Sequence, residues 1–230
     1  MSELSNKTTE LPWYRGPAFI LLVMLLSIYV VSTFLGHEGP GAYLIKALLM
    51  VSLILGVRRI TRSSKAMTLT LIIVLVSIVG QVTVNRFLEE DAFIWDTWMN
   101  LVLFVTVLVF LVSALVKAER VNADTVFAAS SVFVLLGIVC AYAFILVHAA
   151  DPTAFSLSDR DMTQPGTALL HYSFTTLTTV GYGSISPISD VARMISDLEA
   201  LIAQLYLAVV LARLVSLEIE HSRKTEISES

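Results

Sequence analysis

Six long apolar runs constrain this chain more than any other feature of its sequence. They cover residues 17–35, 43–57, 67–84, 97–116, 125–148 and 188–217. A helix that crosses a bilayer needs about 20 apolar residues, so most of these runs are long enough and only 43–57 is short. At about 1.5 Å per residue the last run predicts a helix about 45 Å long, which exceeds the hydrocarbon core. We therefore expect that helix to tilt or to protrude from the membrane.

The composition agrees with a membrane protein. Of the 230 residues, 56% are hydrophobic and 15% are charged, whereas a soluble domain is about 25% charged. Such a chain cannot shield its apolar surface from water in a single core. The formal net charge of −4 gives no indication of a nucleic-acid partner. The single cysteine, Cys140, lies within an apolar run, and we interpret it as a small core residue.

A glycine-containing motif, TTVGYG, lies between the last two apolar runs at residues 178–183. Alone it resembles a strand that ends in a turn, since Thr, Val and Tyr favour strands and Gly permits positive φ. However, a short helical pattern at residues 165–176 precedes it, and an apolar helix follows Pro187. Irregular backbone at membrane depth survives only where protein buries it or where it lines a watery path. This position predicts an ion path with backbone carbonyls as ligands.

The motif and its flanks resemble the selectivity filter of the tetrameric potassium-channel family. TVGYG is itself the standard example of such a filter. The expected preference for K⁺ therefore rests on this resemblance. The resemblance covers residues 125–217, as outer helix, pore helix, filter and inner helix. It implies an all-α membrane protein with six transmembrane helices, a re-entrant pore helix and a selectivity-filter loop. One chain supplies a quarter of each carbonyl ring, which implies a homotetramer with a four-fold symmetric pore.

The resemblance also assigns residues to the filter. It implies that K⁺ is bound at Thr179, Val180, Gly181 and Tyr182, with Gly183 completing the filter. Gly181 and Gly183 permit backbone conformations that turn successive carbonyls the same way, which L-residues resist. Filter support is expected from the residues behind and beside it: Tyr172, Thr175, Thr176, Thr178 and Ser184. By analogy with the family, Tyr172 is expected to hydrogen-bond the hydroxyl of Tyr182.

Two features of the filter surroundings depart from the family pattern. Ser184 stands where an Asp usually follows the filter, and Thr175 stands where many relatives carry a Glu. The carboxylate pair that braces some filters is therefore missing.

The inner helix departs as well, with Ala203 in place of the usual hinge glycine. Its pore or gate candidates are Glu199, Ala203, Gln204, Leu207 and Leu211. Of these, Glu199 is expected to bond the pore helix or a neighbouring subunit, and the leucines to form an apolar gate.

The basic residues predict the orientation. Eleven lie in segments that would be cytoplasmic if residue 1 is inside, and four lie on the outer side. Both termini are therefore expected in the cytoplasm, with the protein in the plasma membrane, of the bacterial inner-membrane type. We divide the chain into a cytoplasmic N-terminus (1–16), a four-helix domain (17–120), a pore domain (121–217) and a cytoplasmic tail (218–230). The fourth run carries no Lys or Arg, so the charges that sense voltage are missing from it.

The sequence thus predicts a passive, potassium-selective channel that is not voltage-gated. It shows no nucleotide loop, metal-ligand cluster or nucleophilic triad, so we expect no enzyme and no cofactor beyond the permeant K⁺. Its expected partners are K⁺, membrane lipids and further copies of itself. Two alternatives remain open: a weakly selective cation channel, and a non-conducting structural subunit. A secondary transporter is disfavoured because the sequence shows no internal repeat.

Overall fold

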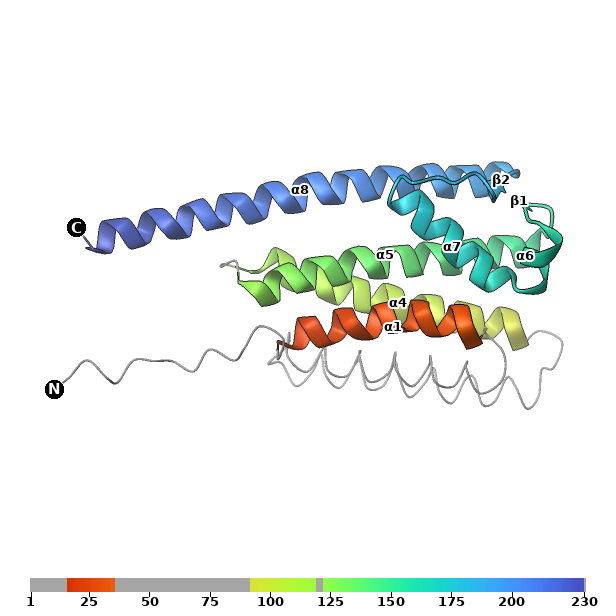
Figure 1. Cartoon of the computed structure of the whole chain (residues 1–230), viewed down its shortest axis with the longest axis horizontal. Coiled ribbons are helices and arrows are strands. Elements are labelled where there is room, and N and C mark those ends of the chain that lie inside the picture. The colour runs from red at the N-terminus through yellow and green to blue at the C-terminus, as the bar shows by residue number, and fades with distance from the viewer. Residues whose placement is uncertain (1–15, 36–91, 119–121, 230) are drawn as a thin grey trace.

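The computed structural model describes residues 16–35, 92–118 and 122–229. It is mostly helical, with two very short strands. Its elements in chain order are α1 (Pro17–Leu35), α4 (Ala92–Val116), α5 (Ala123–Ala150), β1 (Phe155–Ser156), α6 (Asp159–Thr163), α7 (Pro165–Leu177), β2 (Ser186–Pro187) and α8 (Asp190–Glu229). Figure 1 shows α1, α4 and α5 side by side, with the short α7 at one end of α5, next to α8.

Three of the described helices are long and apolar enough to cross a membrane. Their apolar stretches are Phe93–Val116, Ala123–Ala150 and Asp190–Ser216. Helix α1 has the bounds predicted for the first run, and its apolar stretch, Ala18–Val31, is shorter. The predicted runs 43–57 and 67–84 lie outside the described residues. The six-span prediction is thus supported for the last three runs.

Helix α5 is the centre of the subunit because it packs against α1, α4, α7 and α8. The core includes Leu25 from α1, Phe104 from α4, and Leu135 and Ile138 from α5, all of them at most 2% exposed. A helix that is apolar on all sides is typical of a membrane span or a buried core helix. The apolar character of α5 is explained by these contacts with four neighbours.

The N-termini of α1 and α5 lie at the same end of the molecule. The Asn122 side chain accepts a hydrogen bond from the backbone N–H of Thr125 (2.8 Å) and caps α5. One oxygen of Asp124 accepts the free N–H of Ala18 in the first turn of α1 (3.1 Å). Negative charge is favourable at a helix N-terminus. Helices α4 and α8 run in the opposite direction (Figure 1), as helices that cross a membrane in alternating directions would.

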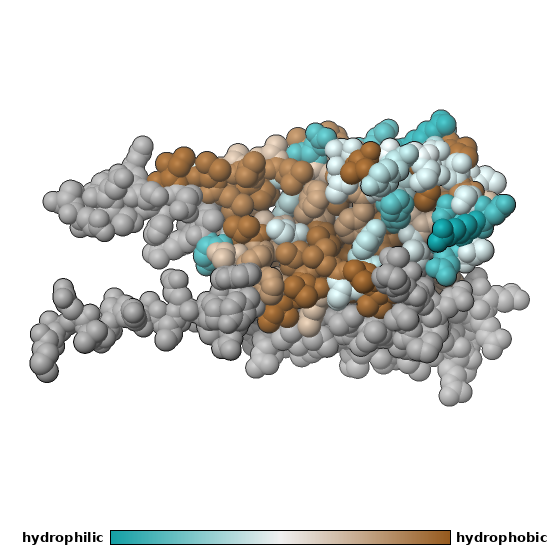
Figure 2. All heavy atoms as spheres, viewed as in Figure 1, coloured by the Kyte–Doolittle hydropathy of each residue, from teal (hydrophilic) through white to brown (hydrophobic). Residues whose placement is uncertain are grey.

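One detail differs from the sequence-based prediction. The all-α prediction missed the antiparallel pair of β1 and β2, in which Phe155 lies opposite Pro187 and Ser156 opposite Ser186. Helix α8 runs on through most of the segment 218–230, assigned above to a tail, and ends at Glu229. Figure 2 shows hydrophilic residues gathered at the end that carries α6 and apolar residues along the helices.

Candidate functional site

Helix α7 places the TTVGYG segment. Pro165 occupies its first turn, where a missing N–H costs no hydrogen bond. The helix ends at Leu177, one residue beyond the predicted end, and the N–H of Thr178 bonds the carbonyl of Phe174 (3.0 Å). The C-terminus of a helix carries a partial negative charge. The TTVGYG segment therefore starts at the end of α7 that attracts cations.

The backbone of the TTVGYG segment alternates in handedness. Thr179, Gly181 and Gly183 have φ angles of 60°, 53° and 77°, and among the described residues these are the ones with positive φ. Val180 and Tyr182 lie between them. Alternation between residues with and without positive φ can turn successive peptide planes toward the same side. The prediction that the glycines permit such conformations agrees with these angles, and Thr179 adopts one without being glycine.

Two further hydrogen bonds fold the segment back onto the end of α7. The N–H of Thr179 donates to the carbonyl of Thr176 (3.0 Å), and the N–H of Gly181 donates to the carbonyl of Thr175 (3.1 Å). The Thr175 hydroxyl itself donates to the carbonyl of Tyr172 (2.9 Å). Thr175 and Thr176 thus contact the segment through their backbone oxygens.

The residues from 178 to 184 are all exposed in the single chain. Val180 is 52% and Tyr182 73% exposed, so neither side chain is covered within the single chain. The Tyr182 ring stacks on His171, with ring centroids 5.9 Å apart and 8° between the planes. Beyond the exposed Ser184, Ile185 is buried in a cluster with Ala154 and Phe155, which fixes the far end of the segment.

Tyr172 does not make the contact predicted for it within this chain. Its hydroxyl donates to Ser196 Oγ of α8 (2.7 Å), and Ser196 donates to the carbonyl of Ala192 (2.7 Å). The ring packs between Phe144 and Phe155. Tyr172 therefore joins α7 to α8, because its hydroxyl lies within the subunit core and not toward Tyr182.

The five inner-helix candidates differ in their burial within the subunit. Glu199 is 1% and Ala203 0% exposed, so both are covered by the neighbouring helices. Gln204, Leu207 and Leu211 are exposed. Glu199, Ala203, Leu207 and Leu211 are four residues apart in turn, so they follow one another along one face of α8. The first two are buried within the subunit, and only Gln204, Leu207 and Leu211 are open to a pore in the single chain.

Glu199 does bond the short helix, as expected. The Ser173 hydroxyl of α7 lies 2.5 Å from Glu199 Oε1 and 2.7 Å from the carbonyl oxygen of Gly137 in α5. This contact joins three helices behind the TTVGYG segment.

Sequence reasoning missed Gly137, Ser173 and Ser196, which make these helix contacts. A β-carbon added at Gly137 would lie 3.1 Å from Leu177 Cδ2, so the glycine lets α7 approach α5 closely. Small and hydroxyl-bearing residues in an apolar helix are the signal that indicates close helix packing in membranes.

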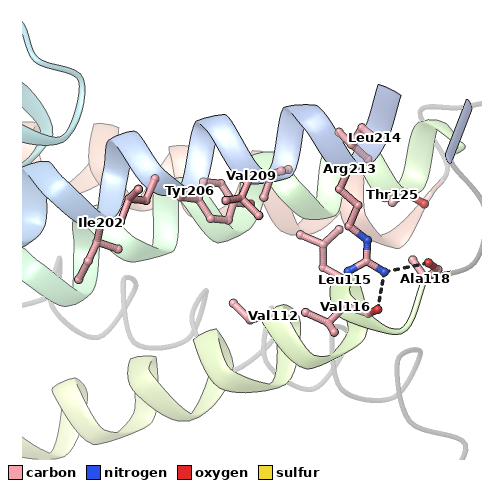
Figure 3. Close-up of a pocket in the computed structure, with 12 residues that line it drawn as sticks. Val112, Leu115, Val116, Ala118, Thr125, Ile202, Tyr206, Val209, Arg213 and Leu214 are labelled. Atoms are coloured by element: carbon pink, nitrogen blue, oxygen red, sulfur yellow. Dashed lines mark hydrogen bonds between the residues drawn. The ribbon is translucent and has the colours of Figure 1, made fainter. Parts of the chain in front are cut away.

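Arg213 joins α8 to the end of α4. Its guanidinium donates to the carbonyls of Val116 and Ala118 (Figure 3). A cation is favourable at a helix C-terminus, where the last carbonyls have no partner in the helix. Beside it lies an apolar pocket of about 360 Å³, whose lining residues come from α4, α5 and α8 and include Leu115, Ile202 and Val209. Arg213 thus links the end of α4 to the C-terminal half of α8.

The region of this site matches a known family. Residues 142–220 match the family model described as "Ion channel". The matched region runs from the second half of α5 through α7 and the TTVGYG segment into α8. Comparison with curated proteins and with solved structures returned no match. The match and the three long apolar helices indicate a membrane protein with an ion channel domain, and the match supports passive ion conduction.

Proposed function

We propose that this chain is one of four identical subunits of a potassium-selective channel. The observation that carries the proposal is the TTVGYG segment at the C-terminus of α7, with positive φ at every second residue. The family match at residues 142–220 supports an ion channel. Potassium selectivity rests on the resemblance of the segment to the potassium-channel filter.

In this proposal backbone oxygens replace the water around K⁺. The carbonyls of Thr179, Val180, Gly181 and Tyr182, four copies of each, form stacked rings around the ion, together with the Thr179 hydroxyl. Positive φ at alternate residues lets these carbonyls point to one side. The partial negative charge at the end of α7 stabilises a cation at membrane depth, where lipid would not.

A tetramer is required because one chain cannot surround an ion. The exposed Val180 and Tyr182 side chains would then pack against neighbouring subunits instead of water. Gln204 is proposed to face the cavity below the filter. Leu207 and Leu211 are proposed to form an apolar constriction that closes by dewetting.

The channel is proposed to be insensitive to voltage. Helix α4 contains no Lys or Arg, and each elementary charge that crosses 100 mV contributes about 2.3 kcal/mol. Without such charges in α4, the field exerts little force on it. The segment 17–120 then serves as a support on the outside of the pore domain. Both termini are proposed to be cytoplasmic, with the protein in the plasma membrane.

The test is a flux and reversal-potential measurement on the purified protein in liposomes. We expect K⁺ and Rb⁺ to pass, Na⁺ and Li⁺ to be excluded, and the current to show no voltage threshold. A reversal potential that does not shift when K⁺ is exchanged for Na⁺ would favour the weakly selective cation channel. One observation favours the weakly selective channel. The Thr175 hydroxyl bonds the backbone of its own helix, so the Thr175 side chain does not support the TTVGYG segment. Complete absence of flux would favour the non-conducting subunit.

A further inference from the structure

We infer that Glu199 is a neutral, protonated carboxylic acid that donates a hydrogen bond to Ser173 and so holds α7 in position behind the TTVGYG segment. Glu199 is thus a positioning residue, since it acts on the TTVGYG segment through α7. Any effect of Glu199 on ion conduction rests on the proposed function, whereas the protonation of Glu199 does not depend on it.

The hydrogen count of the contact supports this protonation state. Three oxygens lie in a row: the Gly137 carbonyl, Ser173 Oγ 2.7 Å away, and Glu199 Oε1 2.5 Å beyond. Two such short contacts require two hydrogens. A serine hydroxyl supplies one, and a backbone carbonyl supplies none. The second hydrogen must therefore belong to Glu199, which donates to Ser173 while Ser173 donates to Gly137.

The surroundings of the carboxyl group agree with a neutral form. Glu199 is 1% exposed, and its second oxygen, Oε2, is buried without a hydrogen-bond partner among the described residues. No Lys or Arg in the described part of the chain pairs with it. An ionised carboxylate would place charge on that unpartnered oxygen, and an unpaired buried charge costs far more than a buried neutral carbonyl.

The titratable neighbours of Glu199 are few. Cys140 approaches it from α5, and Tyr172 faces it from α7. On α8 itself, Asp197 lies two residues away and is exposed. None of these three carries a positive charge in any protonation state, so none of them stabilises a carboxylate at position 199.

The proton on Glu199 makes the stability of the folded protein fall as pH rises. The folded protein keeps the proton on Glu199, whereas an exposed glutamate in the unfolded chain loses it at neutral pH. Because the unfolded state then binds fewer protons, stability declines as pH rises. When Glu199 finally ionises in the folded protein, the row of Glu199, Ser173 and Gly137 loses one of its two hydrogens, and one of the hydrogen bonds that position α7 is lost.

Infrared spectroscopy of the purified full-length protein tests the proton directly. The difference spectrum between wild type and Glu199→Gln at neutral pH is expected to contain the C=O band of a protonated acid. Asp197→Asn is the matched control, because an exposed carboxyl on the same helix is expected to contribute only carboxylate bands. A carboxylate band in place of the acid band at position 199 would overturn the inference.

The pH dependence of thermal stability is a second test. A residue that only filled space would not make stability depend on pH. Glu199→Gln keeps the shape and a donor for Ser173, so it is expected to match wild type at acid pH, below the ordinary glutamate pKa, where the unfolded chain also keeps its proton. It is expected to lose the decline in stability that wild type shows as pH rises from there through neutral to alkaline values. Glu199→Ala removes the donor to Ser173 Oγ, which keeps its bond to the Gly137 carbonyl, and is expected to shift the unfolding equilibrium roughly tenfold. A Gln variant as unstable as the Ala variant at neutral pH would contradict a neutral donor.

Ion flux separates this inference from the proposed function. If K⁺ flux is present, wild type is expected to lose it at alkaline pH while Glu199→Gln retains it, and equal losses in both would overturn the positioning role. If no variant conducts at any pH, the proposed function fails, while the infrared band and the stability profile still decide whether Glu199 holds its proton.

Discussion

Thr179, Gly181 and Gly183 adopt the left-handed backbone region, which is ordinary for glycine and costly for threonine. An L-residue in this region costs about 1–2 kcal/mol. Such strain persists where the surrounding structure enforces it, often at functional sites. Here the bond from the Thr179 N–H to the carbonyl of Thr176 helps to enforce it.

Replacing Gly181 with alanine is expected to abolish K⁺ flux without preventing assembly. A β-carbon at Gly181 would meet nothing within 4 Å, so the effect arises from its φ of +53° and not from a clash. Liposome flux and native mass spectrometry measure the two properties. Gly166→Ala, in the first turn of α7, is the control, because alanine is favourable in a helix. Full K⁺ selectivity in Gly181→Ala would exclude the segment as the filter.

Asp151, just outside the α5 span, gives a pH-dependent prediction. The pKa of its carboxyl is lowered because the Thr153 hydroxyl, and then the Thr153 backbone N–H, donate to it. Its stabilising effect is thus present above the ordinary aspartate pKa and is lost as pH falls through the lowered value. Thr153→Val is expected to raise the pKa of Asp151 in an NMR titration. Thr163→Val, whose hydroxyl bonds the Arg160 carbonyl, should leave that pKa unchanged.

The positive φ angles at Gly181 and Gly183 were predictable because the glycines stand in a contiguous motif. The partners of Ser173 and Ser196 were not, because each contact joins residues far apart in the sequence: Gly137 to Ser173, and Tyr172 to Ser196. A sequence pattern shows which face of a helix is apolar, but it does not show which hydroxyl meets which carbonyl across two helices. For the same reason the contact of Tyr172 with Ser196 was not predicted.

At the scale of elements, α7 is positioned by its neighbours and not by its own length. Tyr172 ties it to α8, Ser173 ties it to α5 and α8, and Gly137 lets it lie close to α5. The bounds of α5 and α7 were predicted to within a few residues, since apolar runs and a proline at the first turn are local signals. The pairing of β1 with β2 was missed because two-residue strands carry no periodicity.

Gly137→Val is expected to separate α7 from α5. The added methyl groups would start from a β-carbon only 3.1 Å from Leu177 and 3.3 Å from Phe174. Overpacking of this kind costs about 1–3 kcal/mol, so the melting temperature should fall by several degrees. Ala143→Val, on the same helix and partly exposed, is the control. Unchanged stability in Gly137→Val would show that α7 has room to move away.

Arg213→Met is expected to loosen the connection between α4 and α8. The variant loses charge-assisted hydrogen bonds to the carbonyls of Val116 and Ala118, which are worth roughly 1.5–3 kcal/mol. The open probability in planar bilayers should change about tenfold, while ion selectivity stays as in wild type. Lys117→Met removes an exposed charge nearby and should change neither. If both variants gate like wild type, α4 does not act on α8 through Arg213.

At the scale of the whole molecule, the exposed apolar surface of α8 requires other molecules to cover it. Leu201, Leu205 and Leu211 are each at least 55% exposed, whereas most of α5 is covered by its four neighbours. Lipid covers part of this surface in a membrane, and in the proposed tetramer neighbouring copies of α8 cover the rest.

Oxidative cross-linking tests the placement of the proposed gate. In a Cys140→Ala background, Leu211→Cys is expected to form disulfides between subunits. A disulfide requires the α-carbons of its two cysteines to lie about 6 Å apart, and the proposed gate brings residue 211 of neighbouring α8 helices close together. Val102→Cys, on the exposed side of α4, should not. A Leu211→Cys protein that assembles as a tetramer but resists cross-linking would place the constriction elsewhere.

Only residues 117–122 separate the end of α4 from the start of α5, and the two helices pack against each other. A connection this short leaves no reach for α4 to dock on a different copy of the pore domain. In a tetramer, the four-helix domain of each chain would therefore pack against the pore domain of the same chain. In mixed assemblies, a defect confined to the helices before α5 is therefore expected to act on the pore-domain segment of the same chain, whereas a defect in the shared TTVGYG rings would affect all four chains.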